Sequence, residues 1–321
     1  MSNRREDRPR TQWPYVVGLV LLAGLAAGVL AQVFRTLRAR DMLGLGPPTS
    51  TPTLTVAPTS TQISEAETYL AWGKAAIKRG EYELAVSDLS EAIRLSHADA
   101  EAYYERGRAH FFLGQYVPTV QDLGQAIALQ SDYAEAYYYR GATYSALTLY
   151  DRAIADLTTA VTLVPRFPDA YHQRGRVRFL LDEHDLALAD YDRALELHPD
   201  FAECLYDRGL VYVAREAYAL AESDFSAVVD LMPAWGEPYY WLGNARFRQE
   251  KYIEALESYD LAIEQMPDHA ASYHARGLTH RRLGHVEEAK SDFEWVVAHA
   301  QDPNLLSGAQ IQLDEMKTGQ D

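Results

Sequence analysis

The side chains most able to do chemistry, ten histidines and one cysteine, stand in no catalytic or metal-binding pattern. His274, His280 and His285 form the closest trio, but spacings of six and five residues fall outside the helical contact spacings of three and four. Cys204 has no second cysteine to pair with and is interpreted as a small apolar residue inside a helix. The GxSxG, HExxH, CxxC and P-loop motifs are absent from the sequence. We therefore expect no enzyme activity, no metal site and no cofactor.

A second series of residues has the chemistry of binding. Phenylalanine returns in every second period of a 34-residue repeat, at Phe111, Phe179 and Phe247. The residues three positions before them are Arg108, Arg176 and Asn244. Because residues three apart share one face of a helix, each pair presents a ring beside hydrogen-bonding groups. Large rings interleaved with arginine suit a surface that binds a peptide. The alternative is that these rings only pack between neighbouring helices.

The elements that position these residues are helical hairpins, repeated every 34 residues from Ala66 to Pro303. The seven segments are residues 66–99, 100–133, 134–167, 168–201, 202–235, 236–269 and 270–303. The eighth residue of every segment is glycine: Gly73, Gly107, Gly141, Gly175, Gly209, Gly243 and Gly277. A glycine inside a helix costs about 1 kcal/mol relative to alanine, so its return predicts a second helix packed too close for a side chain. Proline at position 32 of four segments, in Pro165, Pro199, Pro233 and Pro267, predicts where the second helix ends.

This pattern resembles the tetratricopeptide repeat (TPR), whose period and order of Trp, Leu, Gly, Tyr, Ala, Phe, Ala and Pro it follows. The fragment AEAYYYRGATYSALTLYDRAIADLTTAVTLVP in the third segment carries the pattern well. Thr119, beside Pro118, departs from the usual alanine and leaves the start of that second helix open. The resemblance implies an all-α, right-handed superhelical solenoid of seven TPR helical hairpins. Residues 304–318 are expected to form a C-terminal capping helix over the last hairpin.

The resemblance also implies which side chains touch a ligand, namely positions 2, 5, 9, 12 and 13 of each first helix. Position 5 adds Tyr104, Tyr138, His172, Tyr206 and Tyr240 to the predicted peptide- or protein-binding groove. For these residues, too, packing between first helices is the alternative. The lysine, asparagine and arginine clamp with which some relatives hold the acidic tails of chaperones is not reproduced, since Leu70 and Glu105 are among the residues at its positions.

Arginine at position 7 and aspartate at position 23 occur together in five segments and are both missing from the sixth, which has Leu242 and Ser258. The pairs are Arg106 with Asp122, Arg140 with Asp156, Arg174 with Asp190, Arg208 with Asp224, and Arg276 with Asp292. We expect each pair to join the two helices of one hairpin. A partly buried ion pair of this kind specifies packing register more than it adds stability.

The N-terminal part of the chain differs from the repeats. Residues 1–12 form a short basic tail, and residues 13–34 contain a run from Tyr15 to Ala31 without a charged side chain. Twenty helical residues span the roughly 30 Å hydrocarbon layer, so residues 13–34 are predicted to be a transmembrane helix in contact with the lipid bilayer. A cleaved signal peptide is the alternative. Gly24 and Gly28 form a GxxxG pair that would support weak self-association of such helices.

Residues 35–63 are predicted to be a linker rich in proline, threonine and serine, and Ser64 with Glu67 forms a capping box that predicts the first helix of residues 64–303. Residues 304–321 hold the capping helix and a tail. Stalks of this composition resemble those of exported bacterial proteins, so we expect the N-terminus inside the cell and the repeats outside. The alternative is a plain spacer on the cytoplasmic side. The formal net charge of −16 argues against nucleic acid as a partner.

The sequence therefore predicts a membrane-tethered scaffold of bacterial type that binds partner proteins or peptides. The alternative is an accessory or assembly subunit of an envelope machine for export or cofactor assembly.

Overall fold

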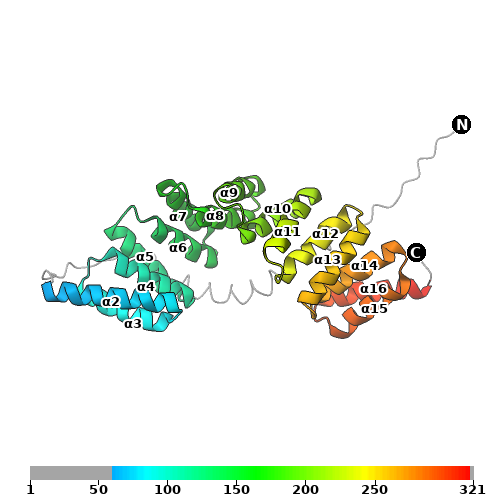
Figure 1. Ribbon diagram of the computed structural model, residues 1–321, viewed down its shortest axis with the longest axis horizontal. Coiled ribbons are helices and arrows are strands. Elements are labelled where there is room, and N and C mark those ends of the chain that lie inside the picture. Colours follow the sequence, from blue (N-terminus) through cyan, green and yellow to red (C-terminus); the bar gives the residue numbers. More distant parts are fainter. Residues whose placement is uncertain (1–59, 319–321) are drawn as a thin grey trace. The chain divides into compact units, whose positions relative to one another are not determined.

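The computed structural model describes residues 60–318, which form fifteen α-helices and no strand (Figure 1). The first helices of the hairpins are α2 (Ser60–Arg79), α4 (Ala100–Phe112), α6 (Ala134–Ala146), α8 (Pro168–Leu180), α10 (Ala202–Ala214), α12 (Gly236–Arg248) and α14 (Ala270–Leu283). The second helices are α3 (Tyr82–Leu95), α5 (Tyr116–Leu129), α7 (Tyr150–Leu163), α9 (His184–Leu197), α11 (Tyr218–Leu231), α13 (Tyr252–Gln265) and α15 (Val286–His299). A last helix, α16, spans Pro303–Thr318. The prediction of an all-helical chain of hairpins is confirmed for these residues.

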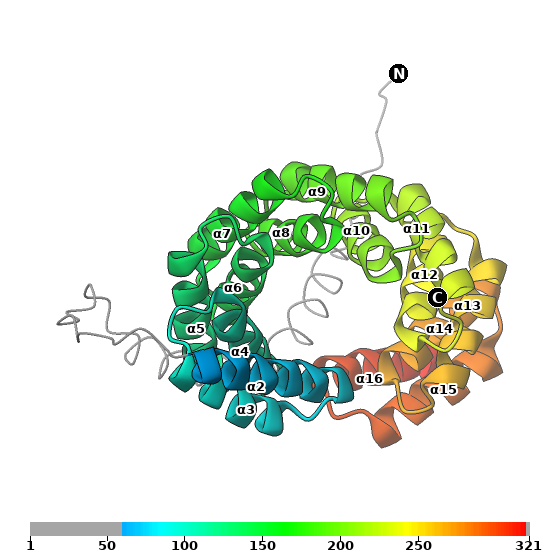
Figure 2. The same cartoon turned by 60° about the vertical axis from the view of Figure 1, so that its left-hand side comes forward.

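The chain divides into two compact units at the first turn of α7, between Arg152 and Ala153. Unit 1 contains α2 to α6, and unit 2 contains most of α7 and the helices α8 to α16. Within unit 2, the first helices α8, α10, α12 and α14 lie on one side and the second helices α9, α11, α13 and α15 on the other (Figure 2). The superhelix of all seven hairpins stays a prediction.

Helix ends follow the local sequence. The helices α7, α9, α11 and α13 each end two residues before a position-32 proline, as predicted. Pro118 lies in the first turn of α5, where its missing N–H has no helical partner to lose, so α5 begins normally at Tyr116. The residue that turns each hairpin has a left-handed backbone. This residue is Gly80, Gly114 or Gly284 in three hairpins and Thr148, Asp182, Glu216 or Glu250 in the other four.

The core of every hairpin that lies within one unit is the contact between the position-8 glycine and the residue at position 24. A Cβ added to Gly175 would lie 2.6 Å from Cε1 of Tyr191, and a Cβ added to Gly243 would lie 2.5 Å from Cε1 of Tyr259. Real side chains essentially never approach so closely, so only glycine fits while the ring stays in place. The rings of Tyr191 and Tyr259 are fully buried as a result. The close packing predicted from the repeated glycine is confirmed.

Four of the five predicted arginine and aspartate pairs are also confirmed, and their bonds are bidentate, whereas the pair of Arg140 with Asp156 stays a prediction. The Arg174 guanidinium donates to both carboxylate oxygens of Asp190, at 2.9 and 2.6 Å. Equivalent bonds of 2.7 to 3.0 Å join three further pairs: Arg106 with Asp122, Arg208 with Asp224, and Arg276 with Asp292. The remaining nitrogen of Arg174 reaches back to Thr158 on the second helix before, at 3.2 Å. Arg106, Arg208 and Arg276 make equivalent bonds to the second helix before them. Each of these arginines therefore joins three helices, whereas the sequence predicted that it would join two.

The sixth hairpin replaces this link with another. Leu242 and Ser258 are buried where the other hairpins have arginine and aspartate. Arg246, one turn further along α12, donates to the Ser258 hydroxyl at 2.9 Å. Its counterpart in the fourth hairpin, Arg178, donates to Asp190 at 2.8 Å. The joint loss of both residues thus leaves no buried charge without a partner.

The C-terminal helix α16 packs on the last hairpin as predicted. Ala309 and Leu313 are buried against a cluster that includes Phe293 and Val296. Gly308 sits over the imidazole of His274, so that an added Cβ would lie 3.1 Å from Nε2. Burial lowers the pKa of His274 to about 4, so the ring is neutral at pH 7. The helix therefore covers apolar surface at the end of unit 2.

One helix boundary differs from its prediction, because α2 begins at Ser60 and not at Ser64. The nearest helix-breaking residue is Pro58, so nothing after it stops the helix from extending past the capping box. The predicted transmembrane helix at 13–34, with Gly24 and Gly28, lies outside the described residues, as does the linker up to residue 59. Among residues 60–318 no helix has the length and apolar character needed to cross a bilayer.

Replacing Gly175 with alanine is expected to lower the free energy of unfolding by about 1–2 kcal/mol, because overpacking against Tyr191 outweighs the gain in helix propensity. Urea unfolding followed by circular dichroism measures the effect. Gly124 in α5 is the matched control, since an added Cβ would meet only Nη1 of Arg140, at 3.8 Å. Alanine at Gly124 should leave stability equal or raise it by up to about 1 kcal/mol. Equal destabilisation at both sites would contradict the packing argument.

Replacing Arg174 with leucine and Asp190 with serine copies the natural arrangement of the sixth hairpin. Asp190→Ser leaves the Arg174 guanidinium buried without its carboxylate and is expected to cost about 3 kcal/mol, whereas Arg174→Leu leaves Asp190 with Arg178 alone and is expected to cost about 2 kcal/mol. The double variant should cost less than the sum by at least about 1.5 kcal/mol, since Arg178 is placed to donate to the new hydroxyl as Arg246 does to Ser258. A thermal-unfolding double-mutant cycle measures this coupling. Additive effects would show that the pair does not join the helices.

Candidate functional site

The position-5 residues of the predicted groove pack inside their own repeats. Four of the five rings lie against the residue that precedes the next first helix. The centroid distances are 4.6 Å for Tyr104 with Tyr133, 4.7 Å for His172 with Phe201, 4.7 Å for Tyr206 with Trp235, and 5.0 Å for Tyr240 with His269. Tyr104 and His172 are buried, whereas Tyr138, Tyr206 and Tyr240 are partly buried. Burial raises the pKa of the Tyr104 phenol, so it stays protonated. Ligand contact by this set stays a prediction, with little surface to support it at Tyr104 and His172.

In unit 1, Arg108 is held by its neighbours. Its guanidinium lies over the rings of Tyr104 and Tyr139, 5.5 and 5.4 Å from their centroids. It also donates to the carboxylate of Glu105 at 2.7 Å. Burial raises the pKa of Glu105, against the opposite effect of Arg108 and Lys74. Only 25% of the Arg108 side chain is exposed, so the guanidinium mainly makes contacts within unit 1.

Phe111 joins a run of aromatic rings in unit 1. Its ring lies 5.5 Å from that of Tyr139 and 5.7 Å from that of Phe112. Phe112 stacks on Tyr82 of α3 and is 45% exposed, more than any other ring in this run. Phe111 was predicted from the sequence, whereas Phe112 and Tyr139 were missed. The signal was available for Phe112, which stands at position 13 of its first helix, one of the ligand-contact positions implied by the resemblance.

In unit 2, the predicted residues His172 and Arg176 on α8 meet Asp207 on α10. Nε2 of His172 donates to Oδ2 of Asp207 at 2.7 Å, and Nε of Arg176 lies 3.3 Å from the same oxygen. His172 is buried, Asp207 is mostly covered, and 54% of the Arg176 side chain is exposed. Sequence reasoning missed Asp207, because its partners lie in the preceding repeat. Arg176 is therefore the predicted groove arginine that keeps surface for a ligand.

The remaining predicted residues of unit 2 lie along the same series of first helices. Phe179 packs against the cluster around Tyr191, and Leu180 beside it is 48% exposed. Asn244 accepts a hydrogen bond from the Tyr259 hydroxyl at 2.9 Å. Phe247 contacts Tyr252, with centroids 5.4 Å apart. Phe179, Asn244 and Phe247 are partly buried, so their side chains contribute to packing as well as to the surface.

We use the name first-helix surface for a selected set of residues that stand at position 6, 9, 12 or 13 of the first helices. In unit 1 its members are Arg108, Phe111, Phe112 and Tyr139. In unit 2 they are Arg176, Phe179, Leu180, Trp241, Asn244 and Phe247. Both sets combine aromatic rings with an arginine, and the set of unit 2 also contains an asparagine and a leucine. Each unit therefore carries side chains that can hold apolar and polar parts of a peptide together.

The histidine spacing led to a wrong expectation for one pair. Nδ1 of His280 lies 3.2 Å from Nδ1 of His285. The helical contact spacings do not apply to this pair, because the left-handed Gly284 ends α14 between them and turns His285 back toward His280. Even so, residues 60–318 contain no group of three or more ligating side chains placed to hold a metal ion.

Comparison with known proteins agrees with the hairpin geometry. Family models match in three places: a TPR repeat model at residues 73–114 and tetratricopeptide repeat models at residues 168–201 and 236–302. The search among curated proteins gave no match.

Among solved structures, YrrB is described as a TPR protein with an unusual peptide-binding site. It is 26% identical, with a TM-score of 0.51, and the match covers 59% of this chain and 97% of YrrB. A tetratricopeptide repeat protein from Parabacteroides merdae ATCC 43184 is 18% identical with a TM-score of 0.56, covering 77% and 99%. A chain of the APC/C hetero-tetramer Cut9-Hcn1 is 14% identical with a TM-score of 0.57, covering 80% and 53%. The chain therefore contains tetratricopeptide repeats and shares the fold of TPR proteins.

Proposed function

We propose that this chain is a scaffold that holds partner proteins or peptides on its first-helix surface. TPR proteins generally mediate protein–protein interactions, and the repeats found in this chain support the same task here. The observation that carries the proposal is the pairing of phenylalanine with arginine or asparagine on every second first helix, α4, α8 and α12. Phe112 and Leu180 add apolar surface to these pairs, because each is nearly half exposed and follows a partly buried phenylalanine.

Apolar side chains that remain exposed beside satisfied polar groups are the usual anchors for a peptide. They add contact area, while the neighbouring arginine fixes orientation through its fork of donors. In unit 1 the rings of Phe111, Phe112 and Tyr139 contact one another and leave a continuous aromatic face. The peptide-binding site described for YrrB supports the same kind of ligand here.

We also infer a membrane tether from residues 13–34. The uncharged run from Tyr15 to Ala31 is long enough to cross a bilayer, and the proline-rich stretch after it would hold the repeats away from the surface. The same stretch favours repeats outside the cell. An accessory role in an envelope machine would use the same layout, and it is distinguished by whether the partner belongs to a membrane complex.

Replacing Phe111, Phe179 and Phe247 with alanine in the full chain is expected to lower the recovery of peptides from a displayed random library at least tenfold. The reason is the loss of three aromatic anchors. Because Phe179 also packs in the core, a second variant changes only the exposed Phe112 and Leu180 to serine, and it should give a loss in the same direction with an unchanged unfolding midpoint.

The matched control replaces Leu186, Leu220 and Ile253 with alanine. These side chains are exposed on the second helices α9, α11 and α13 and are expected to have no effect on recovery. Equal losses in the first-helix and second-helix variants would mean that the binding surface lies elsewhere. Unchanged recovery in both first-helix variants would refute the assignment.

Protease treatment of intact cells tests the tether and its orientation. We expect the repeats to be digested from outside while a fragment containing residues 13–34 stays with the membrane. Deleting residues 13–34 should release the repeats from the membrane fraction. Full protection in intact cells, with digestion only after lysis, would mean that the repeats lie on the other side.

A further inference from the structure

Two hairpins carry a buried phenol at the same position, but only one of the two hydroxyls has a hydrogen-bond partner. Tyr191 on α9 and Tyr259 on α13 occupy equivalent positions, and both side chains are fully buried. The Tyr259 hydroxyl donates to Oδ1 of Asn244 at 2.9 Å. In the fourth hairpin the place of Asn244 is taken by Arg176, whose guanidinium has donors but no acceptor. Among the described residues the Tyr191 hydroxyl has no hydrogen-bond partner.

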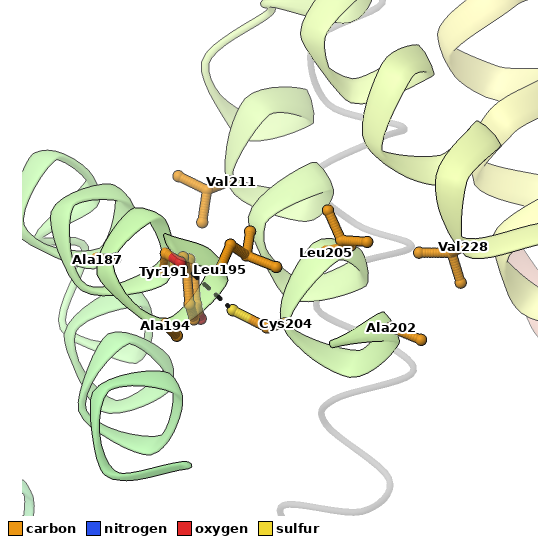
Figure 3. Packing of buried hydrophobic residues seen from close by; sticks show 9 residues of the cluster. All are labelled: Ala187, Tyr191, Ala194, Leu195, Ala202, Cys204, Leu205, Val211 and Val228. Atoms are coloured by element: carbon orange, nitrogen blue, oxygen red, sulfur yellow. Dashed lines mark hydrogen bonds between the residues drawn. The ribbon is translucent and has the colours of Figure 1, made fainter. Parts of the chain in front are cut away.

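A buried donor without a partner destabilises a fold by about 1–3 kcal/mol, so its presence calls for a reason. Tyr191 lies in the cluster of Figure 3, where its backbone oxygen accepts from the Cys204 thiol at 3.7 Å. Burial raises the pKa of Tyr191, with Asp207 acting in the same direction and Arg176 against it. The hydroxyl thus keeps its proton and lies within the electrostatic reach of the Arg176 and Asp207 side chains.

Neighbouring side chains position Arg176 but leave some of its N–H donors without an acceptor. Its Nε faces Asp207 at 3.3 Å, and its Nη1 has a long contact of 3.5 Å to Gln173. Asp207 in turn accepts the shorter bond of 2.7 Å from His172. More than half of the Arg176 side chain is exposed, whereas Arg108 at the same position of the second hairpin is enclosed by two rings and a carboxylate. The guanidinium therefore keeps donors for a ligand.

We propose that Arg176 binds a carboxylate of the bound peptide, and that this carboxylate gives the Tyr191 hydroxyl the acceptor that Asn244 gives Tyr259. The proposal rests on the peptide-binding function inferred above and names its chemistry. A single guanidinium fork matches a carboxylate in a bidentate arrangement. Arg176 stands at the position from which Asn244 reaches the Tyr259 hydroxyl, so a carboxylate held by Arg176 lies on the side of the helix that faces the Tyr191 hydroxyl.

The surroundings limit what else the peptide carries. Phe179 lies one turn further along α8, with the exposed Leu180 beside it, so the residues next to the carboxylate meet apolar surface. Asp207 and the net charge of −16 disfavour a phosphate or a run of acidic residues. The ligand that fits is a mostly apolar peptide with one carboxylate, from an acidic side chain or from its own C-terminus.

The test uses the full chain, immobilised in detergent, and two pools of short N-acetylated peptides of alanine, leucine and phenylalanine. One pool ends in a free carboxylate and the other in an amide. We expect the wild-type chain to retain the carboxylate pool about tenfold better, as for a hydrogen bond to a charged group. Replacing Arg176 with asparagine should reduce this preference to less than twofold.

The thermal stability of the same variant provides a second measurement, which does not depend on peptide binding. Asparagine at Arg176 supplies the acceptor that Tyr191 lacks, so the unfolding midpoint should rise, even though an ion pair to Asp207 is removed. Replacing Tyr191 with phenylalanine should weaken the carboxylate preference several-fold without lowering the midpoint. The matched control is Arg193→Asn, which removes a similarly exposed arginine from α9 and should leave the preference unchanged.

The outcomes separate this proposal from the scaffold function. If the wild-type chain retains both pools equally, peptide binding stands and the carboxylate site is refuted. If R176N keeps the preference, the carboxylate binds elsewhere and the proposal also fails. If neither pool is retained while the displayed library still yields ligands that depend on Phe112 and Leu180, the surface binds peptides of other chemistry and the carboxylate site is again refuted.

Discussion

The close approach of two helices at the position-8 glycine is the constraint on which the rest of each hairpin depends. With no Cβ on Gly175, the Tyr191 ring lies directly against the backbone of α8. That short separation allows Arg174, one residue earlier, to reach both oxygens of Asp190, one residue before the ring, in bonds of 2.9 and 2.6 Å. Bidentate geometry of this kind tolerates little displacement. The glycine therefore sets the distance, and the ion pair sets the register.

The side chain at position 24 then decides whether the residue at position 9 of the first helix has to supply a hydrogen-bond acceptor. Leucine occupies this position in Leu89 and Leu123 and makes no polar demand on its neighbours. A tyrosine at the same depth brings its hydroxyl to the level of position 9, where Tyr259 finds Asn244 and Tyr191 finds no acceptor. A packing choice in the core thus becomes a chemical condition on the surface residue. This is how one constraint on the fold connects to the site.

Most of the fold could be predicted from the sequence because its determinants recur at a fixed period. The repeated glycine and proline indicated the hairpins and the ends of α7, α9, α11 and α13, and the joint loss at Leu242 and Ser258 revealed the ion pairs. What could not be predicted depends on residues that meet across a turn or between repeats. His280 and His285 meet because Gly284 reverses the chain between them. The link from Arg174 to Thr158 and that from Arg176 to Asp207 each join neighbouring hairpins, and a comparison within one repeat cannot reveal such contacts.

The site was harder to predict because residue type alone does not separate structural from ligand-binding side chains. Arg174 and Arg176 are two residues apart on α8, and both are arginines that recur through the chain. Arg174 places its donors on Asp190 and Thr158 and is nearly enclosed. Arg176 shares one carboxylate oxygen with His172 and keeps most of its surface. The two arginines differ in how many of their donors already have acceptors, and the sequence alone does not show this number. An arginine whose donors all have acceptors holds hairpins together, whereas an arginine that keeps free donors, such as Arg176, is available to a partner.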